Sequence, residues 1–351
     1  MSSSREAVQA AQAIAGIRQG YFQNLVMCGV TRADIADLER QLAADTTITL
    51  PRGLAQYSEL LAVLGGRSTY VSNLKTMLQL GLWEHHKIVY RLDADLAHDL
   101  GNLGDGDVIH REVLRRLPHP NPYIHLPSPI LFTSNSRRTM QVRGFFVSGS
   151  RYDGDDPVLC STHHPQRQHL VLLFPRLPHP AADHSADADM SEIEFSRFNL
   201  KFAGPTATLG ELIADVQRHF TDHTSNMPAE DVATLLRTSI APILYTCTVD
   251  PDIRRTAAGH SKKHRWQGRA VTAYDLGYRL GDAIRSWKAA RVARSQTAGT
   301  GTGATRRPHW RKPHLHTYRV GVGRTETVIR YLSGLPVNGY TGTDVPTVIP
   351  V

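Results

Sequence analysis

A short basic segment near the C-terminal end contains the side chains best suited to chemistry on phosphate groups. Residues 306–319 read RRPHWRKPHLHTYR. If 314–319 forms a strand, the period of two places His314, His316 and Tyr318 on one face. Alternate residues of a strand lie about 6–7 Å apart. That spacing would allow two imidazoles to bracket one phosphodiester group.

Two histidines in this arrangement suit general acid–base catalysis. The unperturbed pKa of histidine lets one ring accept a proton and another donate one near neutral pH. With the 2′-hydroxyl as nucleophile, such a pair would cleave RNA without a metal ion. His314, His316 and Tyr318 are therefore the catalytic candidates. Contact with phosphates or bases without catalysis is the favoured interpretation, and a structural role stays open.

The neighbouring cations suit the binding of phosphates. Arg311 or Arg319 could hold the non-bridging oxygens through two parallel hydrogen bonds. A second basic patch with an aromatic side chain, at 261–266, suits phosphate contact with base stacking, and equally a solvated loop. The expected RNA- or phosphate-binding residues are His309, Arg311, Lys312, Arg319, Arg307, Lys262, Lys263, Arg265 and Trp266.

A metal site is the competing chemical interpretation of the same histidines. His-x-His can chelate a metal, and His309 could be a third ligand. The surrounding cations would repel a divalent ion. Two-metal nucleases also need carboxylates, and residues 254–330 contain only Asp275, Asp282 and Glu326. We therefore expect no metal and no cofactor.

The positive charge is concentrated in one part of the chain. The full sequence of 351 residues has 40 Lys and Arg against 32 Asp and Glu. Residues 254–330 contain 18 of these cations and 3 of these acids, which leaves 22 cations and 29 acids elsewhere. A concentrated basic face favours a polyanionic partner, with a merely solvated face as the alternative.

The bulk composition indicates a globular protein. Apolar residues make up 41% of the chain, which supports a proper core. No run of 18 apolar residues exists, so no membrane association is expected. The N-terminal twenty residues lack the features of a signal peptide. Three widely spaced cysteines, Cys28, Cys160 and Cys247, indicate a reducing compartment. We expect a cytoplasmic location.

Local patterns predict an α+β fold with an N-terminal helical region, a central antiparallel sheet, a helical layer and a C-terminal β-hairpin. Residues 4–100 are predicted to be helical, with Thr31 and Asp34 as a capping box and another helix from Ser68 that stops near Gly81. An antiparallel meander is predicted at 123–126, 129–133, 140–148 and 169–174. Further helices are predicted at 209–220, 229–249 and 271–294.

The last predicted element is a hairpin of two strands, 314–320 and 326–332, joined by Gly321-Val322-Gly323-Arg324. A flexible linker is expected at 295–304. The expected organisation is a helical N-terminal region (1–115), an antiparallel β region (116–205), a helical region with a basic helix (206–295) and a C-terminal basic His/Arg hairpin (305–351). The last of these could form one composite domain with 116–295.

The same residues resemble the C-terminal signature of a known family. The matching pieces are RPHWRKPHLHTY (307–318), Gly323-Arg324, Tyr331-Leu332 and PVN (336–338). ILY (243–245) before DPDI (250–253) and YDLG (274–277) before RLG (279–281) also fit. The family is the type V-A anti-CRISPR group that blocks production of the effector nuclease, and its relatives occur on bacterial mobile elements. Members typically have His-Trp-His where this chain has His314-Leu315-His316.

The resemblance covers residues 118–340 loosely and 305–338 most specifically. It implies loss of the effector's messenger RNA during translation, through recognition of the nascent N-terminus. The expected partner is RNA or a translating ribosome, with a nascent or extended peptide as a further candidate. The hypothesis is that the chain binds RNA and lowers expression of a specific gene.

Three rival hypotheses stay open. The first is a metal-independent endoribonuclease that uses His314 and His316. The second is a protein–protein interaction module in which a sheet edge captures an extended peptide by strand addition. The third is a DNA-binding regulator, although no helix-turn-helix with a basic recognition helix is evident.

Overall fold

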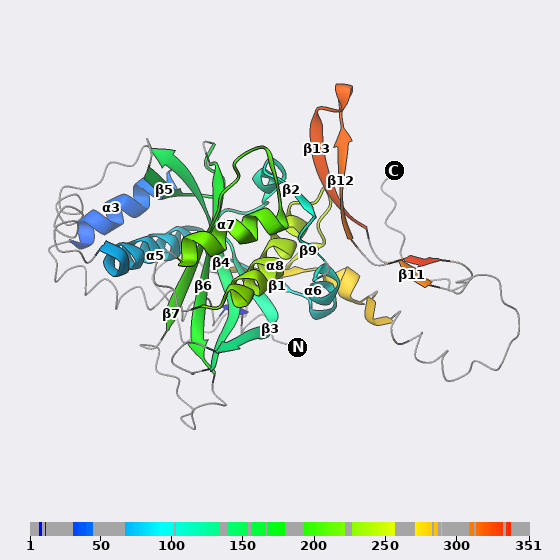
Figure 1. The fold of residues 1–351 in the computed structure, drawn as a ribbon, viewed down its shortest axis with the longest axis horizontal. Coiled ribbons are helices and arrows are strands. Elements are labelled where there is room, and N and C mark those ends of the chain that lie inside the picture. Colours follow the sequence, from blue (N-terminus) through cyan, green and yellow to red (C-terminus); the bar gives the residue numbers. More distant parts are fainter. Residues whose placement is uncertain are drawn as a thin grey trace, which may run out of the picture.

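The protein is built around one mixed β-sheet with helices on both faces (Figure 1). The computed structural model describes residues 7–8, 11, 31–44, 67–101, 103–133, 139–153, 156–165, 167–179, 193–221, 227–256, 271–282, 284–286, 289, 309–311, 314–332 and 335–337. This arrangement confirms the predicted α+β class, with its central, mostly antiparallel sheet.

The main sheet has eight strands, seven of them in the order β7-β6-β4-β3-β1-β10-β9, while β5 pairs with β4. Their bounds are β1 Ile88–Leu92, β3 Tyr123–Thr133, β4 Thr139–Asp153, β5 Asp156–Cys160, β6 His169–Pro178, β7 Glu194–Leu200, β9 Ile253–Thr256 and β10 Thr272–Leu276. β3, β4 and β6 pair antiparallel, which confirms the predicted meander except that the runs 123–126 and 129–133 form one strand, β3, and β7 extends the antiparallel order. β1 is parallel to both β3 and β10.

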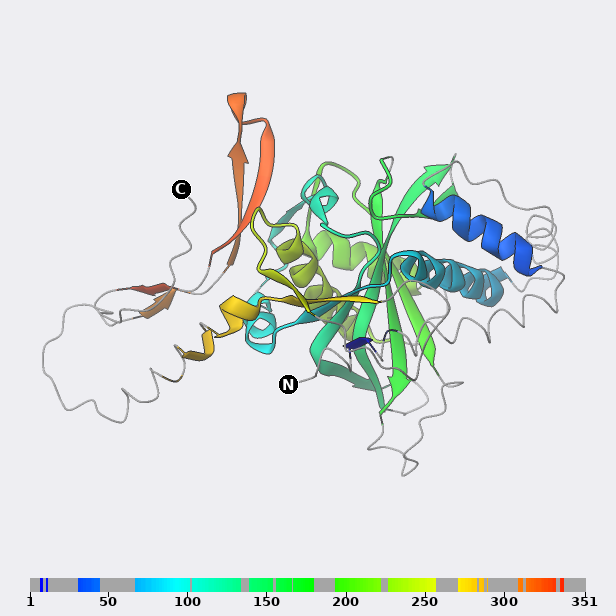
Figure 2. The ribbon, with the colours of Figure 1, turned by 180° about the vertical axis from the view of Figure 1, so that it is seen from behind.

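Both faces of the sheet are buried. Successive residues of one strand enter different clusters: Phe145 and Val147 belong to the larger core and Phe146 to the smaller one. The helices α6 (Ala94–Leu100), α7 (Leu209–Thr221) and α8 (Ala229–Thr246) cover the larger core. α5 (Arg67–His86) contributes Leu80 and Trp83 to the smaller core. Figure 2 shows these two layers from behind.

Several helix signals in the sequence are confirmed. Thr31 and Asp34 form the capping box of α3 (Arg32–Ala43), with reciprocal bonds between side chains and backbone. α7 occupies the predicted 209–220 region, and α8 contains Pro242 within a largely buried helix. None of the described helices combines the length and the apolar character needed to cross a lipid bilayer.

The helical interpretation of 4–100 is wrong for residues 88–92, which form β1. The prediction of a helix over 271–294 is also wrong at its start, because Thr272–Leu276 form β10 and helical residues begin at 278. Both strands pair with partners far away in the sequence, and local periodicity does not report such pairing. α5 continues past Gly81 to His86, and β5 and β7 were not predicted.

The remaining elements lie outside the main sheet. β2 (Val108–His110) pairs with β8 (Thr206–Thr208), and the 3-10 helix η1 spans Val113–Arg116. β11 (His309–Arg311) pairs with β14 (Leu335–Val337). β12 (His314–Val320) and β13 (Glu326–Leu332) form the predicted hairpin, with the 3-10 turn η3 (Val322–Arg324) between them. The expected linker at 295–304 lies outside the described residues.

Candidate nucleic-acid interface

The β12–β13 hairpin projects from the body of the molecule (Figures 1 and 2). Seven residue pairs, from His314 opposite Leu332 to Val320 opposite Glu326, set its register. The turn places Gly321, Gly323 and Arg324 at φ values of 83°, 73° and 55°. Glycine adopts such values at little cost, so the Gly-Val-Gly sequence favours this turn.

One face of β12 presents a ladder of three rings, which we call the His–Tyr ladder (His314, His316, Tyr318). The ring centroids of His314 and His316 lie 6.1 Å apart, and those of His316 and Tyr318 lie 4.5 Å apart. The prediction that period two brings these three side chains together is therefore confirmed. His316 and Tyr318 are exposed, and His314 is half-buried.

The other side of the ribbon anchors the hairpin to the body. Leu315, Ile329 and Tyr331 pack against the larger core, and the ring of Tyr331 meets Tyr245 edge-on at 5.3 Å. The amide of Val249 also donates a hydrogen bond to the carbonyl of Ile329, at 3.1 Å. Because side chains alternate along a strand, this anchoring leaves the His–Tyr ladder on the face that points away from the core.

Three exposed arginines accompany the ladder. Arg330 lies directly opposite His316, and its guanidinium is 5.9 Å from the ring centroid of Tyr318. Arg324 lies at the tip of the hairpin, and Arg319, the residue after Tyr318 on β12, alternates onto the opposite face of the strand. Exposed aromatic rings can stack on bases, and arginines can bind phosphates. The face therefore has both kinds of group that single-stranded nucleic acid requires.

The structure does not bring every predicted site residue to this face. His309 and Arg311 belong to β11, which pairs with β14 rather than with the hairpin. Arg307, Lys312, Lys262, Lys263, Arg265 and Trp266 lie outside the described residues. Their predicted roles stay predictions.

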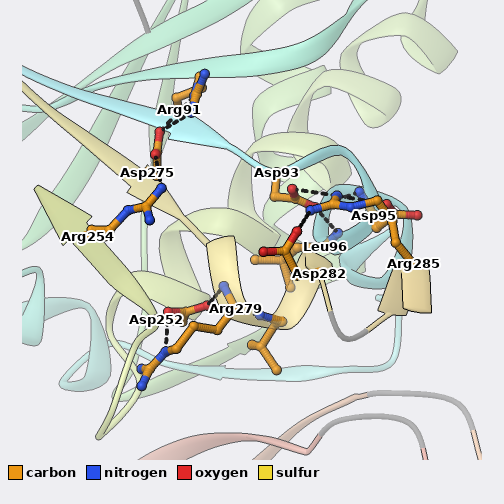
Figure 3. A network of polar contacts seen from close by, with 11 residues as sticks. Arg91, Asp93, Asp95, Leu96, Asp252, Arg254, Asp275, Arg279, Asp282 and Arg285 are labelled. Atoms are coloured by element: carbon orange, nitrogen blue, oxygen red, sulfur yellow. Dashed lines mark hydrogen bonds and ion pairs between the residues drawn. The ribbon is translucent and has the colours of Figure 1, made fainter. Parts of the chain in front are cut away.

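Other arginines of the basic segment are paired with aspartates of the protein (Figure 3). Asp275 on β10, 4% exposed, accepts a hydrogen bond from Nε of Arg91 at 2.7 Å and one from Arg254 at 3.1 Å. Arg254 also lies over the ring of Tyr278, 4.1 Å from its centroid. These contacts join β1, β10 and β9, so Arg254 has a structural role.

The segment after β10 contains two further ion-pair groups. Asp252 accepts hydrogen bonds from the backbone amides of Arg279 and Leu280 and from Nε of Arg279, at 2.7, 3.1 and 2.9 Å. Arg285 bonds Asp93, Asp95 and Asp282 (Figure 3). These bonds raise the pKa of the Arg285 guanidinium. We call Asp252, Asp275 and their arginine partners, together with the Arg285 group, the carboxylate network.

Two glycines give the residues of the carboxylate network the space that they need to pack together. Gly277 has φ of +82°, and a Cβ atom there would collide with Leu96. A Cβ atom at Gly281 would collide with the carboxylate of Asp93. The network thus accounts for much of DPDI (250–253) and of YDLG–RLG (274–281), and the second of these lies in the segment that charge counting alone treated as a basic face.

Two further observations concern metals and thiols. Within the described ranges, no group of three or more His, Cys, Asp or Glu side chains is placed to hold a metal ion. Cys160 and Cys247 are buried free thiols, and Cys28 lies outside the described residues. Burial raises the pKa of the Cys247 thiol to about 12, which disfavours a thiolate nucleophile.

Comparison with known proteins identifies a family that the sequence matches and a solved structure with a similar fold. The profile of the AcrVA2-like family, described as anti-CRISPR type V subtype A2, matches residues 90–339. A solved structure titled "Crystal structure of AcrVA2" is 17% identical, with 92% of this chain and 98% of that chain covered and a TM-score of 0.52. At this identity the likeness is one of fold. No curated protein matches the chain.

Proposed function

The chain belongs to the anti-CRISPR type V subtype A2 family, and from this premise we propose that it silences a specific gene by binding RNA. The proposed contact surface is the His–Tyr ladder with Arg330 on the same face, extended toward the tip of the hairpin by Arg324 and Arg319. The RNA would be a messenger, free or on a translating ribosome. Binding would lower expression of the gene, as the family resemblance suggested.

The observation that supports this proposal is the orientation of the hairpin. Its apolar residues hold it to the core, while rings and guanidinium groups occupy exposed positions. Exposed aromatic rings are a sequence-tolerant platform for bases, worth about 1–3 kcal/mol per stacked base. Arginine adds contacts to the phosphates, and these release counterions from the nucleic acid.

Direct cleavage of RNA is a second candidate function, and one distance favours it. The 6.1 Å between the rings of His314 and His316 leaves room for a phosphate group between an acid and a base. Tyr318 lies against His316 and could orient it. Peptide capture by strand addition stays a prediction; β7 and β9 are the outer strands of the main sheet.

The first test is the salt dependence of RNA binding, measured by filter binding from low to moderate salt. On single strands, log affinity falls by about 0.7 per phosphate contact for each log unit of salt. We expect the double variant Arg319→Gln, Arg330→Gln to reduce the slope by about 1.4. The matched control is Arg40→Gln, Arg218→Gln, which removes two exposed arginines of α3 and α7.

A flat salt profile of the native protein, or equal effects of the two double variants, would contradict the proposal. Deletion of 254–330 is unsuitable as a test, because β9 and β10 are strands of the main sheet.

Sequencing of the RNA that copurifies with the protein then identifies the target RNA. Its cellular level should fall when the native protein is expressed and should be less affected by the hairpin variant.

A further inference from the structure

Arg167 is a buried cation in the loop between β5 and β6. Its side chain is 5% exposed, and its Nη1 atom has no hydrogen-bond partner. The aliphatic part of the Arg167 side chain lies so close to Gly149 of β4 that a Cβ atom at residue 149 would lie 2.8–2.9 Å from Cδ and Cγ of Arg167. The glycine thus makes room for the arginine, which shows that the fold accommodates this burial.

The electrostatic surroundings of Arg167 contain no compensating carboxylate among the described residues. The neighbouring groups that influence the pKa of Arg167 are the thiols of Cys247 and Cys160 and the guanidinium of Arg115. Burial, with a smaller contribution from the charge of Arg115, lowers the pKa of Arg167 to about 10, although the two thiols act to raise it. Arg167 therefore differs from Arg254 and Arg279, each of which reaches a buried aspartate.

Further basic side chains lie near Arg167 on other elements. Arg115 and Arg116 are exposed on η1. The positive charges of Arg116 and Arg167 both act to lower the pKa of the Cys247 thiol, so both lie near it. His163 is also exposed, with its Nε2 atom 2.7 Å from the carbonyl of Leu117. Burial, and to a smaller extent the nearby His163, lower the pKa of the half-buried His119.

Aromatic rings complete one side of this cluster. His119 lies 4.3 Å from Tyr274, ring centroid to centroid, at an interplanar angle of 34°. Its Nδ1 atom is hydrogen-bonded to the hydroxyl of Tyr90. Tyr90 lies near enough to Cys247 for the thiol to influence its pKa. A half-buried pair of aromatic rings beside positively charged side chains is a surface on which a base with an attached phosphate can stack.

We propose that Arg167, Arg115 and Arg116 form an anion site that binds the phosphate group of a nucleotide or of RNA. A buried guanidinium nitrogen without an acceptor is unfavourable, because it has lost its hydration and gained no hydrogen bond in return. A phosphate supplies several acceptor oxygens and the opposite charge, which three arginines bind well. η1 also contacts β13, so the site lies beside this strand of the hairpin.

The test is thermal unfolding of the full chain with inorganic phosphate, compared with chloride at equal ionic strength. A ligand that binds only the folded state raises the melting temperature. We expect phosphate to raise it in the native protein and to have no specific effect on Arg167→Met. Without phosphate, Arg167→Met should be at least as stable as the native protein, because it removes an unpaired buried charge.

Arg197→Met is the matched control. Arg197 on β7 also has an unpartnered Nη1 atom and a pKa lowered to about 10 by burial, but no other charged group influences it. This variant should keep the native response to phosphate. Equal phosphate responses in the native protein and Arg167→Met, or no response in either, would overturn the proposal.

A second variant covers the case in which Arg167→Met does not fold. The exposed pair Arg115→Gln, Arg116→Gln should leave the core intact and raise the phosphate concentration for half-maximal stabilisation about tenfold, a loss of about 1.4 kcal/mol. An unchanged midpoint in this variant would count against the site.

Nucleotide probes identify the source of the phosphate. Stabilisation by adenosine monophosphate indicates a free nucleotide. Stabilisation by a 5′-phosphorylated oligoribonucleotide, and not by its 5′-hydroxyl form, indicates an RNA end. The site does not depend on RNA binding by the hairpin. The variant Arg319→Gln, Arg330→Gln should keep the full response to inorganic phosphate, so the two proposals fail separately.

Discussion

The basic C-terminal segment contains arginines in two different environments. Arg254 and Arg279 of the carboxylate network each bind a buried aspartate that joins strands or the start of a helix. Arg319, Arg324 and Arg330 of the hairpin are exposed, as Arg254 and Arg279 are, but the structure records no ion pair for them within its described residues. Both groups count equally in the net charge of the sequence.

The difference separates charge that stabilises the fold from charge that can bind a partner. A guanidinium already bonded to a buried carboxylate would have to break that bond before it could bind a phosphate. An exposed guanidinium loses only hydration and side-chain entropy. The hairpin is therefore where variants should affect RNA binding, and the network is where they should affect folding.

The largest effect is expected when Asp252 of the network is replaced by alanine. The change leaves the amides of Arg279 and Leu280 without their acceptor, and each unsatisfied donor costs about 1–3 kcal/mol. We expect the free energy of unfolding, measured by urea denaturation, to fall by about 2–4 kcal/mol. RNA affinity of the folded fraction should not change.

Asp282→Ala is the control for this prediction. Asp282 is 75% exposed and binds Arg285 at the surface, so its loss should cost less than about 1 kcal/mol. Equal losses of stability in the two variants would show that burial does not set the importance of these carboxylates.

A smaller effect, on affinity alone, is expected for Tyr318→Leu in the hairpin. If a base stacks on this ring, RNA affinity should fall by about 1–3 kcal/mol. Stability should hardly change, because the side chain is 37% exposed. Fluorescence anisotropy with a labelled oligoribonucleotide measures the affinity.

The matched control is Tyr278→Leu, since Tyr278 also lies beneath an arginine but within the network. It should weaken folding and leave RNA affinity unchanged. If Tyr278→Leu weakened RNA binding as much as Tyr318→Leu, the division between the two regions would be wrong.

Elements whose structure depends on a few neighbouring residues were predicted well from the sequence. The Thr31–Asp34 capping box, the meander and the Gly321–Arg324 turn each depend on local geometry. The His–Tyr ladder was predictable for the same reason, because strand alternation alone brings its rings together. These elements needed no knowledge of the tertiary fold.

Features that depend on distant partners were not predictable. Thr272–Leu276 form a strand because β1, some 180 residues earlier, is available as a parallel neighbour. Tyr274 and Tyr278 have helical spacing, but Gly277 with its positive φ separates a strand from a helix between them. The pairing of Arg254 with Asp275, and the isolation of Arg167, likewise appear only in three dimensions.

The smallest effect is expected for His314→Gln and His316→Gln, and it distinguishes binding from catalysis. If the rings only contact phosphate or bases, glutamine keeps a donor and much of the shape. RNA affinity should then fall by about one hydrogen bond, roughly 1 kcal/mol, for each variant. We expect this outcome, with His98→Gln on α6 as an exposed control that changes nothing.

Two other outcomes would assign the histidines differently. An acid–base pair would leave affinity nearly intact and lower a cleavage rate about a hundredfold, because proton transfer is lost while the contacts stay. A metal site would lower binding and cleavage together, a chelator would mimic the variants, and added zinc or manganese would restore the native protein. Unchanged affinity and activity in the folded double variant would exclude the His–Tyr ladder from the function. RNA binding would then have to be sought in the basic residues outside the hairpin.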